Sequence, residues 1–288
     1  MKKQIEKIVP RAARPGMVGD GFRVFNYIPG SIDQRRISPF LMLDFNAEYD
    51  FGPSNKIRGV DVHPHKGFET VTIAYKGSVA HHDSTGNIGV INPGDVQWMT
   101  AGAGILHKEY HEEEFSKRGG PFEMVQLWVN LPKKDKSTAA HYQAITASQM
   151  GKIELPGGAG IINVIAGAIG DVKGPASTYS PVNLFDIKLK KEGEVTTSIP
   201  ATHNTALLVI NGAIEVNGEK AAEHSFVLFK NDGEEIVIKA EEDSVILLLS
   251  GEPINEPIAS YGPFVMNTQE EIYEAIQDFQ AGKFGVLN

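Results

Sequence analysis

Two short segments of this chain carry the residue types that bind transition metals. His63 and His65 flank a proline, and His107 and Glu109 flank a lysine. Alternate side chains of a β-strand point to the same face, so each pair would point in one direction. Two antiparallel strands with such pairs would offer three imidazoles and a carboxylate to one ion. The spacing therefore predicts a mononuclear metal site inside a β-barrel.

The alternative without a metal is that each histidine is a surface residue or a hydrogen-bonded core residue. Repetition of the i, i+2 spacing in two segments argues against it, because burying four such groups without an ion leaves their desolvation uncompensated. Glu69 shares the strand parity of His63 and His65, so it is a further carboxylate that could face inward. Three neutral imidazoles and a carboxylate suit Fe(II), Mn(II), Ni(II), Cu(II) or Zn(II).

The other histidines are weaker candidates. His81 and His82 are adjacent, so they would face opposite ways on a strand, and a turn or an edge is favoured. His111 shares the parity of His107, but the acidic run at 112–114 indicates exposure. The isolated histidines are assigned no role: His141, His203 and His224.

Composition narrows the classes of ligand and location. Lys and Arg number 27 against 36 Asp and Glu, and the formal net charge of −9 disfavours direct binding of DNA or RNA. The sequence has no cysteine, so thiolate ligands and disulfides are excluded. The basic amino terminus lacks the apolar core of a secretory signal, and the longest apolar stretch, 161–169, is far shorter than the ~20 residues of a membrane span. We therefore expect a cytoplasmic protein that does not enter a membrane.

Short apolar runs broken by Gly, Pro, Asn and Asp dominate the chain. Runs rich in β-branched, aromatic and leucine residues predict strands within 70–75, 124–130, 183–189 and 206–210. Many short strands at this spacing are typical of antiparallel sandwiches or barrels rather than of alternating strands and helices. The sequence therefore predicts an all-β fold.

One helix and one domain boundary complete the prediction. Thr268 and Glu271 form a capping box, apolar residues follow at helical spacing, and Gly282 is a stop signal. A polar, lysine-rich segment interrupts the strand rhythm near the middle of the chain. We therefore predict an N-terminal metal-binding barrel over residues 1–135 and a C-terminal barrel without metal over residues 136–288, which ends in the helix.

Four longer motifs surround these residues: HPHKGFETV, NPGDVQWMTAGAGILHKE, QLWVNLP and GEPINEPIASYGPFVMNTQEEI. They resemble the pirin family, a two-domain branch of the cupin superfamily, and the resemblance covers nearly the whole chain. It implies a bicupin fold with the metal in the N-terminal barrel. The family commonly holds iron with three histidines and one glutamate, which correspond here to His63, His65, His107 and Glu109. The wider cupin pattern would instead take its carboxylate from the first motif, at Glu69.

The resemblance implies two classes of function. Several bacterial members are similar to quercetin 2,3-dioxygenases, which open the flavonol ring with O2, and this is our leading hypothesis. It requires one divalent ion per chain, Fe(II) first and Mn, Ni, Cu or Zn as alternatives, and a small aromatic, flavonol-like substrate. The alternative is an iron-dependent, redox-responsive regulatory protein that acts through a protein partner. A metal-dependent isomerase is a third possibility, for which the sequence has no marker.

Within the dioxygenase hypothesis the acids and the pocket wall receive roles. Glu109, or Glu69 if it faces inward, would be the general base that takes the proton of the flavonol hydroxyl. Core packing also explains the residues that we predict for the pocket wall, which are Phe68, Trp98, Met124 and Gln126.

Overall fold

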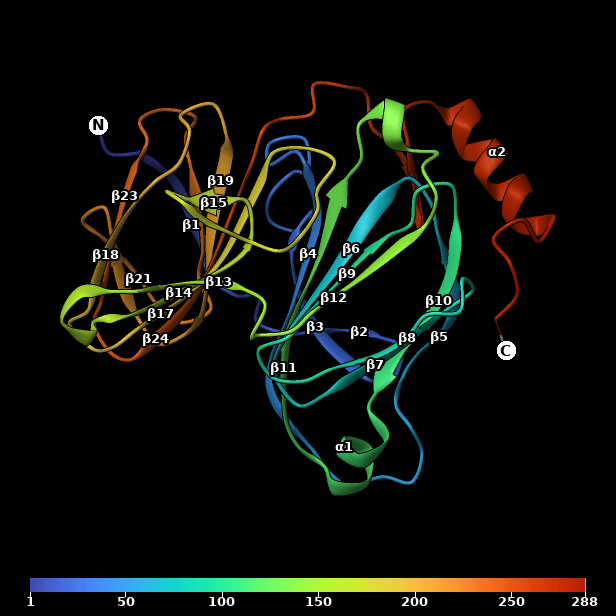
Figure 1. The fold of residues 1–288 in the computed structure, drawn as a ribbon, viewed down its shortest axis with the longest axis horizontal. Coiled ribbons are helices and arrows are strands. Elements are labelled where there is room, and N and C mark those ends of the chain that lie inside the picture. Colours follow the sequence, from blue (N-terminus) through green and yellow to red (C-terminus); the bar gives the residue numbers. More distant parts are fainter. Residues whose placement is uncertain (288) are drawn as a thin grey trace. The chain divides into compact units, whose positions relative to one another are not determined.

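The computed structural model describes residues 1–287, which form two compact units (Figure 1). The N-terminal barrel consists of Arg14–Arg35, Phe40–Ala147 and residues 254–287. The C-terminal barrel consists of Met1–Ala13, Arg36–Pro39 and Ser148–Pro253.

The chain therefore does not divide at one point, as the predicted domains 1–135 and 136–288 supposed. Strand β1 (Ile5–Val9) pairs with β22 (Phe226–Phe229) and forms an edge of the C-terminal barrel. Helix α2 (Gln269–Gln280) belongs to the N-terminal barrel. The prediction assumed that each barrel is built from contiguous chain, and pairing between distant segments leaves no signal in the local sequence.

Two antiparallel sheets make up most of the N-terminal barrel. The larger has seven strands in the order β12 (His141–Ile145), β9 (Val96–Thr100), β6 (Phe68–Lys76), β11 (Gly120–Asn130), β4 (Phe40–Phe51), β3 (Phe22–Ile28) and β2 (Gly16–Val18). The smaller has four strands in the order β5 (Gly59–His65), β10 (Ile105–His111), β7 (Val79–Asp83) and β8 (Ile88–Ile91).

The helices of this barrel begin at side-chain caps. In α1 (Glu113–Arg118) the carboxylate of Glu112 accepts from the first free backbone N–H groups. In α2 the predicted capping box is present, and Ile272 and Ala275 are buried. Helix α2 contacts the hairpin of β25 (Ala259–Tyr261) and β26 (Phe264–Met266). A 3-10 turn, η1 (Lys133–Asp135), follows β11.

The C-terminal barrel is also antiparallel. Its seven-stranded sheet has the order β1, β22, β19 (Asn204–Asn211), β24 (Ser244–Gly251), β17 (Val182–Leu189), β14 (Gly160–Ala166) and β13 (Gly151–Glu154). The shorter elements are β18 (Glu194–Ser198), β23 (Glu235–Ala240), β20 (Ile214–Val216), β21 (Glu219–Ala221), β15 (Ala168–Ile169), β16 (Val172–Lys173) and the 3-10 turn η2 (Pro156–Gly158). Aliphatic and phenylalanine side chains form one large buried cluster in this unit.

The predicted strands are confirmed. Residues 70–75, 124–130, 183–189 and 206–210 lie inside β6, β11, β17 and β19. The all-β prediction holds because these runs place branched and aromatic side chains on pleated, buried surfaces. Within residues 1–287, no helix has both the length and the apolar character that crossing a bilayer requires.

Candidate metal centre

The histidines of the candidate site come from two adjacent strands of the four-stranded sheet. Strands β5 and β10 are antiparallel, and His63 lies directly opposite His107. A β-bulge between His107 and Glu109 adds one residue to β5. A bulge bends its strand and re-aims the neighbouring side chains. The strand alternation from which the two pairs of ligands were predicted is thus interrupted by a bulge, which the sequence did not indicate.

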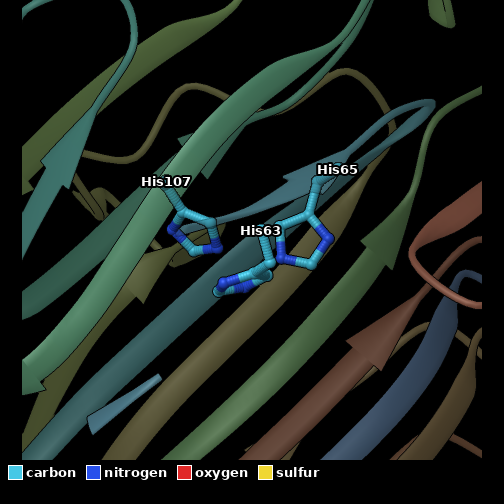
Figure 2. Close-up of side chains that lie close together, drawn as sticks. All are labelled: His63, His65 and His107. Carbon is cyan, nitrogen blue, oxygen red and sulfur yellow. The ribbon is translucent and has the colours of Figure 1, made fainter. Parts of the chain in front are cut away.

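The structure brings the three predicted imidazoles together. One ligand nitrogen from each of His63, His65 and His107 lies within 4.8 Å of the others. Their ring centroids are 4.3 to 4.8 Å apart, and Figure 2 shows the three rings converging on a common point. His65 and His107 are buried, and His63 is partly exposed at the rim. Three rings from two strands thus enclose one small volume.

The hydrogen bonds of these rings leave one nitrogen of each for a ligand. His63 Nδ1 lies 2.8 Å from the backbone oxygen of Asp61, so it carries a proton and its Nε2 is left with a lone pair. His65 Nδ1 and His107 Nε2 are buried without a hydrogen-bond partner. Buried polar atoms without partners are rare and costly. A metal ion among the three rings would satisfy these atoms, so the donor set fits a metal.

Burial keeps the two inner rings neutral. The pKa of His65 is held well below its usual value by desolvation and then by the neighbouring His63. The pKa of His107 is held well below its usual value by desolvation and by the other imidazoles. A neutral imidazole has a lone pair for a metal, whereas an imidazolium does not. The site is therefore ready to bind a cation at neutral pH.

Glu109 lies beside His107 and is held by three side-chain donors. Thr72 Oγ1 and Gln97 Nε2 donate to its Oε1 at 3.1 and 2.9 Å, and Gln126 Nε2 donates to its Oε2 at 2.7 Å. Glu109 forms a second close group with His107 and His81, within 4.8 Å, rather than with His63 and His65. Oε2 has one donor and keeps lone-pair capacity toward a ligand.

Two predicted residues face the opposite side of the larger sheet. The hydroxyl of Thr72 reaches Glu109, and Glu69 lies three residues earlier in the same strand, so the Glu69 side chain points away from the site. It accepts from Thr100 Oγ1 at 2.8 Å, and desolvation raises its pKa to about 7. Trp98 follows Gln97, whose amide reaches Glu109, so the indole of Trp98 also faces away. Catalytic and pocket roles for Glu69 and Trp98 are therefore wrong.

Phe68 and Gln126 lie beside the candidate site, and so does a second aromatic residue, Trp128, that the sequence interpretation missed. The ring of Phe68 is 5.1 Å from that of His65. Trp128 has the parity of Gln126, and its indole lies 5.3 Å from the His65 ring and 4.3 Å from the Phe68 ring. Trp128 is partly exposed, so this wall is open to solvent. Its parity with Gln126 was the signal that could have identified it.

Met124 shares the inward face with Gln126 but belongs to the packed interior. It is 1% exposed and lies in an apolar cluster with Phe22, Phe51 and Phe122. The structure therefore assigns Met124 to the hydrophobic core, which was the alternative explanation at the sequence level.

A row of polar residues crosses the inner face of the larger sheet at one register. Asn26, Asp44, Gln126, Thr72 and Gln97 are successive partners across five strands. Asn26 Nδ2 donates to Asp44 Oδ1 at 2.7 Å, and desolvation raises the pKa of Asp44. Members of such a row stand about 5 Å apart and share one face. The inner face beside Glu109 is thus polar, which a barrel filled by its own side chains would not require.

His81 is the main residue that the sequence interpretation missed. It lies inside β7, not in a turn, and is fully buried. It is opposite Glu109 in the ladder, its Nδ1 is 3.4 Å from His107 Nδ1, and its ring stacks on Tyr142 at 4.9 Å. His82 points the other way, as its adjacency predicted, and is partly exposed. The i, i+2 relation of His81 to Asp83 was the available signal.

The predicted exposure of His111 is also wrong. The side chain is fully buried, stacks on Phe122 at 4.6 Å, and its Nε2 lies 2.8 Å from the backbone oxygen of Gly21. The acidic run beside it caps α1 instead of marking a solvated strand end. Desolvation lowers the pKa of His111 to about 4.

These features agree with comparisons to known proteins. Residues 21–129 match the family model described as Pirin, and residues 184–285 match the Pirin C-terminal cupin domain. A protein of Pseudomonas aeruginosa named "Putative quercetin 2,3-dioxygenase" is 48% identical over 267 residues, which are 93% of each chain. The chain therefore belongs to the pirin family, and its fold is a bicupin.

Solved structures support the same conclusion. The crystal structure of a quercetin 2,3-dioxygenase from Acinetobacter baumannii is 47% identical, covers 100% of both chains and has a TM-score of 0.95. A bacterial pirin from Escherichia coli, solved in complex with nickel(II), is 22% identical, covers 86% of this chain and 100% of its own, and has a TM-score of 0.64. The second comparison shows the fold alone.

Proposed function

We propose that this protein is a metal-dependent dioxygenase of the quercetin 2,3-dioxygenase type, which opens a flavonol ring with O2. The observation that carries the proposal is the convergence of three imidazoles, two of which have a buried ring nitrogen without a hydrogen-bond partner, beside a partly exposed aromatic side chain. The Pseudomonas aeruginosa and Acinetobacter baumannii relatives support the reaction class through their names.

The ligands that we propose are His63, His65, His107 and Glu109, around one Fe(II) ion. Mn, Ni, Cu and Zn satisfy the same nitrogen and oxygen donors. Nickel is bound by the Escherichia coli pirin, whose low identity does not carry its metal to this chain. A bound divalent ion supplies a Lewis acid that lowers the pKa of a hydroxyl group placed against it.

The side chains around that position then have separate tasks. Glu109 accepts the proton that leaves the flavonol 3-hydroxyl, as a general base within hydrogen-bond reach. Gln126, Gln97 and Thr72 hold its carboxylate in one orientation through the hydrogen bonds that they donate. Gln126 is partly exposed, so its side of the carboxylate faces the entrance.

Trp128 binds and orients the aromatic substrate, and the buried ring of Phe68 supports its indole from behind. The two rings are tilted by 35° at 4.3 Å and both adjoin His65, so the partly exposed indole of Trp128 presents an apolar surface to a flat ligand entering beside the histidines. Aromatic pairs of this kind contribute ~1 kcal/mol beyond the area that they bury. A flavonol stacked there also excludes water from the imidazole nitrogens.

The experiment is an aerobic and anaerobic assay of metal-loaded protein with quercetin. We expect loss of the flavonol absorption band only with O2, and no loss with His63→Ala. His141→Ala is the matched control, because His141 is exposed and outside the cluster. Equal turnover by His63→Ala and wild type, or no oxygen-dependent turnover by metal-loaded wild type, would overturn the proposal.

A further inference from the structure

A buried hydrogen-bonded chain leads from a carboxylate to the back of His107. Asp83 Oδ2 lies 3.1 Å from His81 Nε2, and His81 Nδ1 lies 3.4 Å from His107 Nδ1. The residues Asp83, His81 and His107 are 1%, 0% and 0% exposed. Water therefore does not compete for these hydrogen bonds, and the protons must be placed by the protein.

The direction of the hydrogen bonds follows from the carboxylate. Donors surround Asp83, because the backbone N–H and Oγ1 of Thr85 and the backbone N–H of Asn87 all donate to its Oδ1. Desolvation raises the pKa of Asp83, but these hydrogen bonds, together with those that the side chains of His81 and Asn87 donate, outweigh it and hold the pKa well below its usual value. An ionised carboxylate can only accept, so His81 carries its proton on Nε2.

The same rule then fixes the proton of His107. His81 Nδ1 faces His107 Nδ1, and a hydrogen bond between them needs one donor and one acceptor, so with the His81 proton on Nε2 the Nδ1 of His81 accepts from His107 Nδ1. His107 Nε2 is then unprotonated, and this atom is buried without a protein partner. Ligating histidines typically hold the other ring nitrogen in such a hydrogen bond, which sets the tautomer.

We propose that Asp83 and His81 are positioning residues that hold His107 in the Nδ1–H tautomer and so direct its Nε2 lone pair at the metal. The inference rests on the proposed metal site but not on the proposed reaction. His81 has a further orienting contact, because its ring stacks on Tyr142 with an interplanar angle of 21°.

Asp83→Asn is the informative change because it reverses the chain while keeping its shape. The three donors at Oδ1 favour an oxygen there, so the Asn amide nitrogen would take the Oδ2 position and face His81 Nε2. Asn87 Nδ2, which donates to Oδ2 at 3.1 Å in the wild type, would keep its hydrogen bond to Thr85 Oγ1 at 2.7 Å. The amide nitrogen introduced at position 83 donates, so His81 must accept with Nε2 and carry its proton on Nδ1. His107 then accepts with Nδ1 and is protonated on Nε2, the atom that the metal needs.

The first test uses metal-free protein labelled with 15N-histidine. Long-range 1H–15N correlation spectra, assigned with single histidine substitutions, report which ring nitrogen is protonated. We expect Nδ1–H in His107 and Nε2–H in His81, with both tautomers exchanged in Asp83→Asn. A wild-type His107 protonated on Nε2 overturns the proposal, as do unchanged tautomers in the variant.

The second test is titration of metal-free protein with Ni(II) alone, followed by calorimetry. We expect Asp83→Asn to weaken binding by ~10- to 100-fold. His81→Phe, which keeps the stacked ring but removes the acceptor, should weaken it less. His82→Asn should leave it unchanged, because His82 faces the other side of β7.

The order of the variants separates a positioning role from a structural one. Phe replaces a buried imidazole by a larger ring, whereas Asn matches the shape of Asp, so a purely structural role would make His81→Phe the more harmful change. That order overturns the proposal, as does equal Ni(II) affinity of Asp83→Asn and His82→Asn. If Asp83→Asn does not fold, the His107 tautomer in wild type and in His81→Phe decides. Wild type that binds Ni(II) but does not oxidise flavonols overturns the proposed reaction and leaves this inference standing.

Discussion

Glu69 should make the stability of the protein depend on pH without taking part in catalysis. Its side chain is 1% exposed and faces away from the histidines, and desolvation raises its pKa from 4.5 to about 7. When a group has a higher pKa in the folded state than in the unfolded state, the unfolding free energy falls as the pH rises from the unfolded to the folded pKa. The window runs from about pH 4.5, the unfolded value, to about pH 7, the folded value.

The magnitude follows from the two pKa values. A rise from 4.5 to about 7 corresponds to ~3 kcal/mol of differential interaction between the protonation states. Replacing the acid by the neutral Glu69→Gln removes this dependence, and Gln can still accept from Thr100 Oγ1. Relative to wild type, the variant should therefore gain ~3 kcal/mol of unfolding free energy between pH 4 and pH 8.

The assay is urea unfolding of both proteins at several pH values, with Thr100→Val as a second variant that removes the donor to Glu69. Metal content and oxygenase activity at neutral pH should not change in Glu69→Gln. Parallel stability curves for wild type and Glu69→Gln would refute the reasoning about burial. Loss of activity in a folded, metal-loaded Glu69→Gln would refute the assignment of this side chain to the other face of the sheet.

Two further predictions concern the aromatic wall and a buried lysine. Trp128→Leu should weaken flavonol binding by ~5- to 10-fold at unchanged metal content, because the stacking contribution of ~1 kcal/mol is lost. The measurement is quenching of tryptophan fluorescence by the flavonol, and the variant should show little quenching because its remaining tryptophan, Trp98, is fully buried. A variant that is quenched and binds like wild type would contradict this. Lys136→Met should lower the unfolding free energy by ~2–4 kcal/mol. The Nζ of Lys136 donates to Gly67 O, Asn130 Oδ1 and Val265 O at 2.7 to 2.9 Å, and these three buried acceptors would lose their donor. An unchanged midpoint in urea would show that these acceptors find other donors.

The sequence predicted the histidine cluster because strand alternation is a local property. His63 and His65 needed only an extended backbone to point together, and the partner strand at His107 was recognisable by the same spacing. The strands themselves were also predictable, since their β-branched and aromatic residues favour pleated surfaces.

The error at Glu69 has a physical cause in the turn that precedes it. Strand β5 ends at His65 and β6 begins at Phe68. Between them Gly67 has a φ of +88°, a conformation that interrupts the alternation of the strand. Counting alternate residues from His65 across this turn therefore gave the wrong face for Glu69, and it is the side chain of Phe68 that points toward the histidines.

The interleaving of the two units could not be predicted from local pattern. Strand β1 pairs with a strand more than two hundred residues later, and α2 returns to the N-terminal barrel. Both arrangements depend on contacts between segments far apart in the chain, which a local sequence pattern does not record. His81 was missed for a related reason, because its importance comes from the neighbouring strand that carries His107.

The central claim is that three imidazoles of the N-terminal barrel hold one metal ion, and a metal titration tests it most directly. Anaerobic titration of metal-free protein with Fe(II) should give one ion per chain. His107→Ala should abolish that binding, whereas His203→Ala, in the C-terminal barrel, should retain it. Wild type that binds no ion, or His107→Ala that binds Fe(II) with wild-type affinity and stoichiometry, would contradict the account.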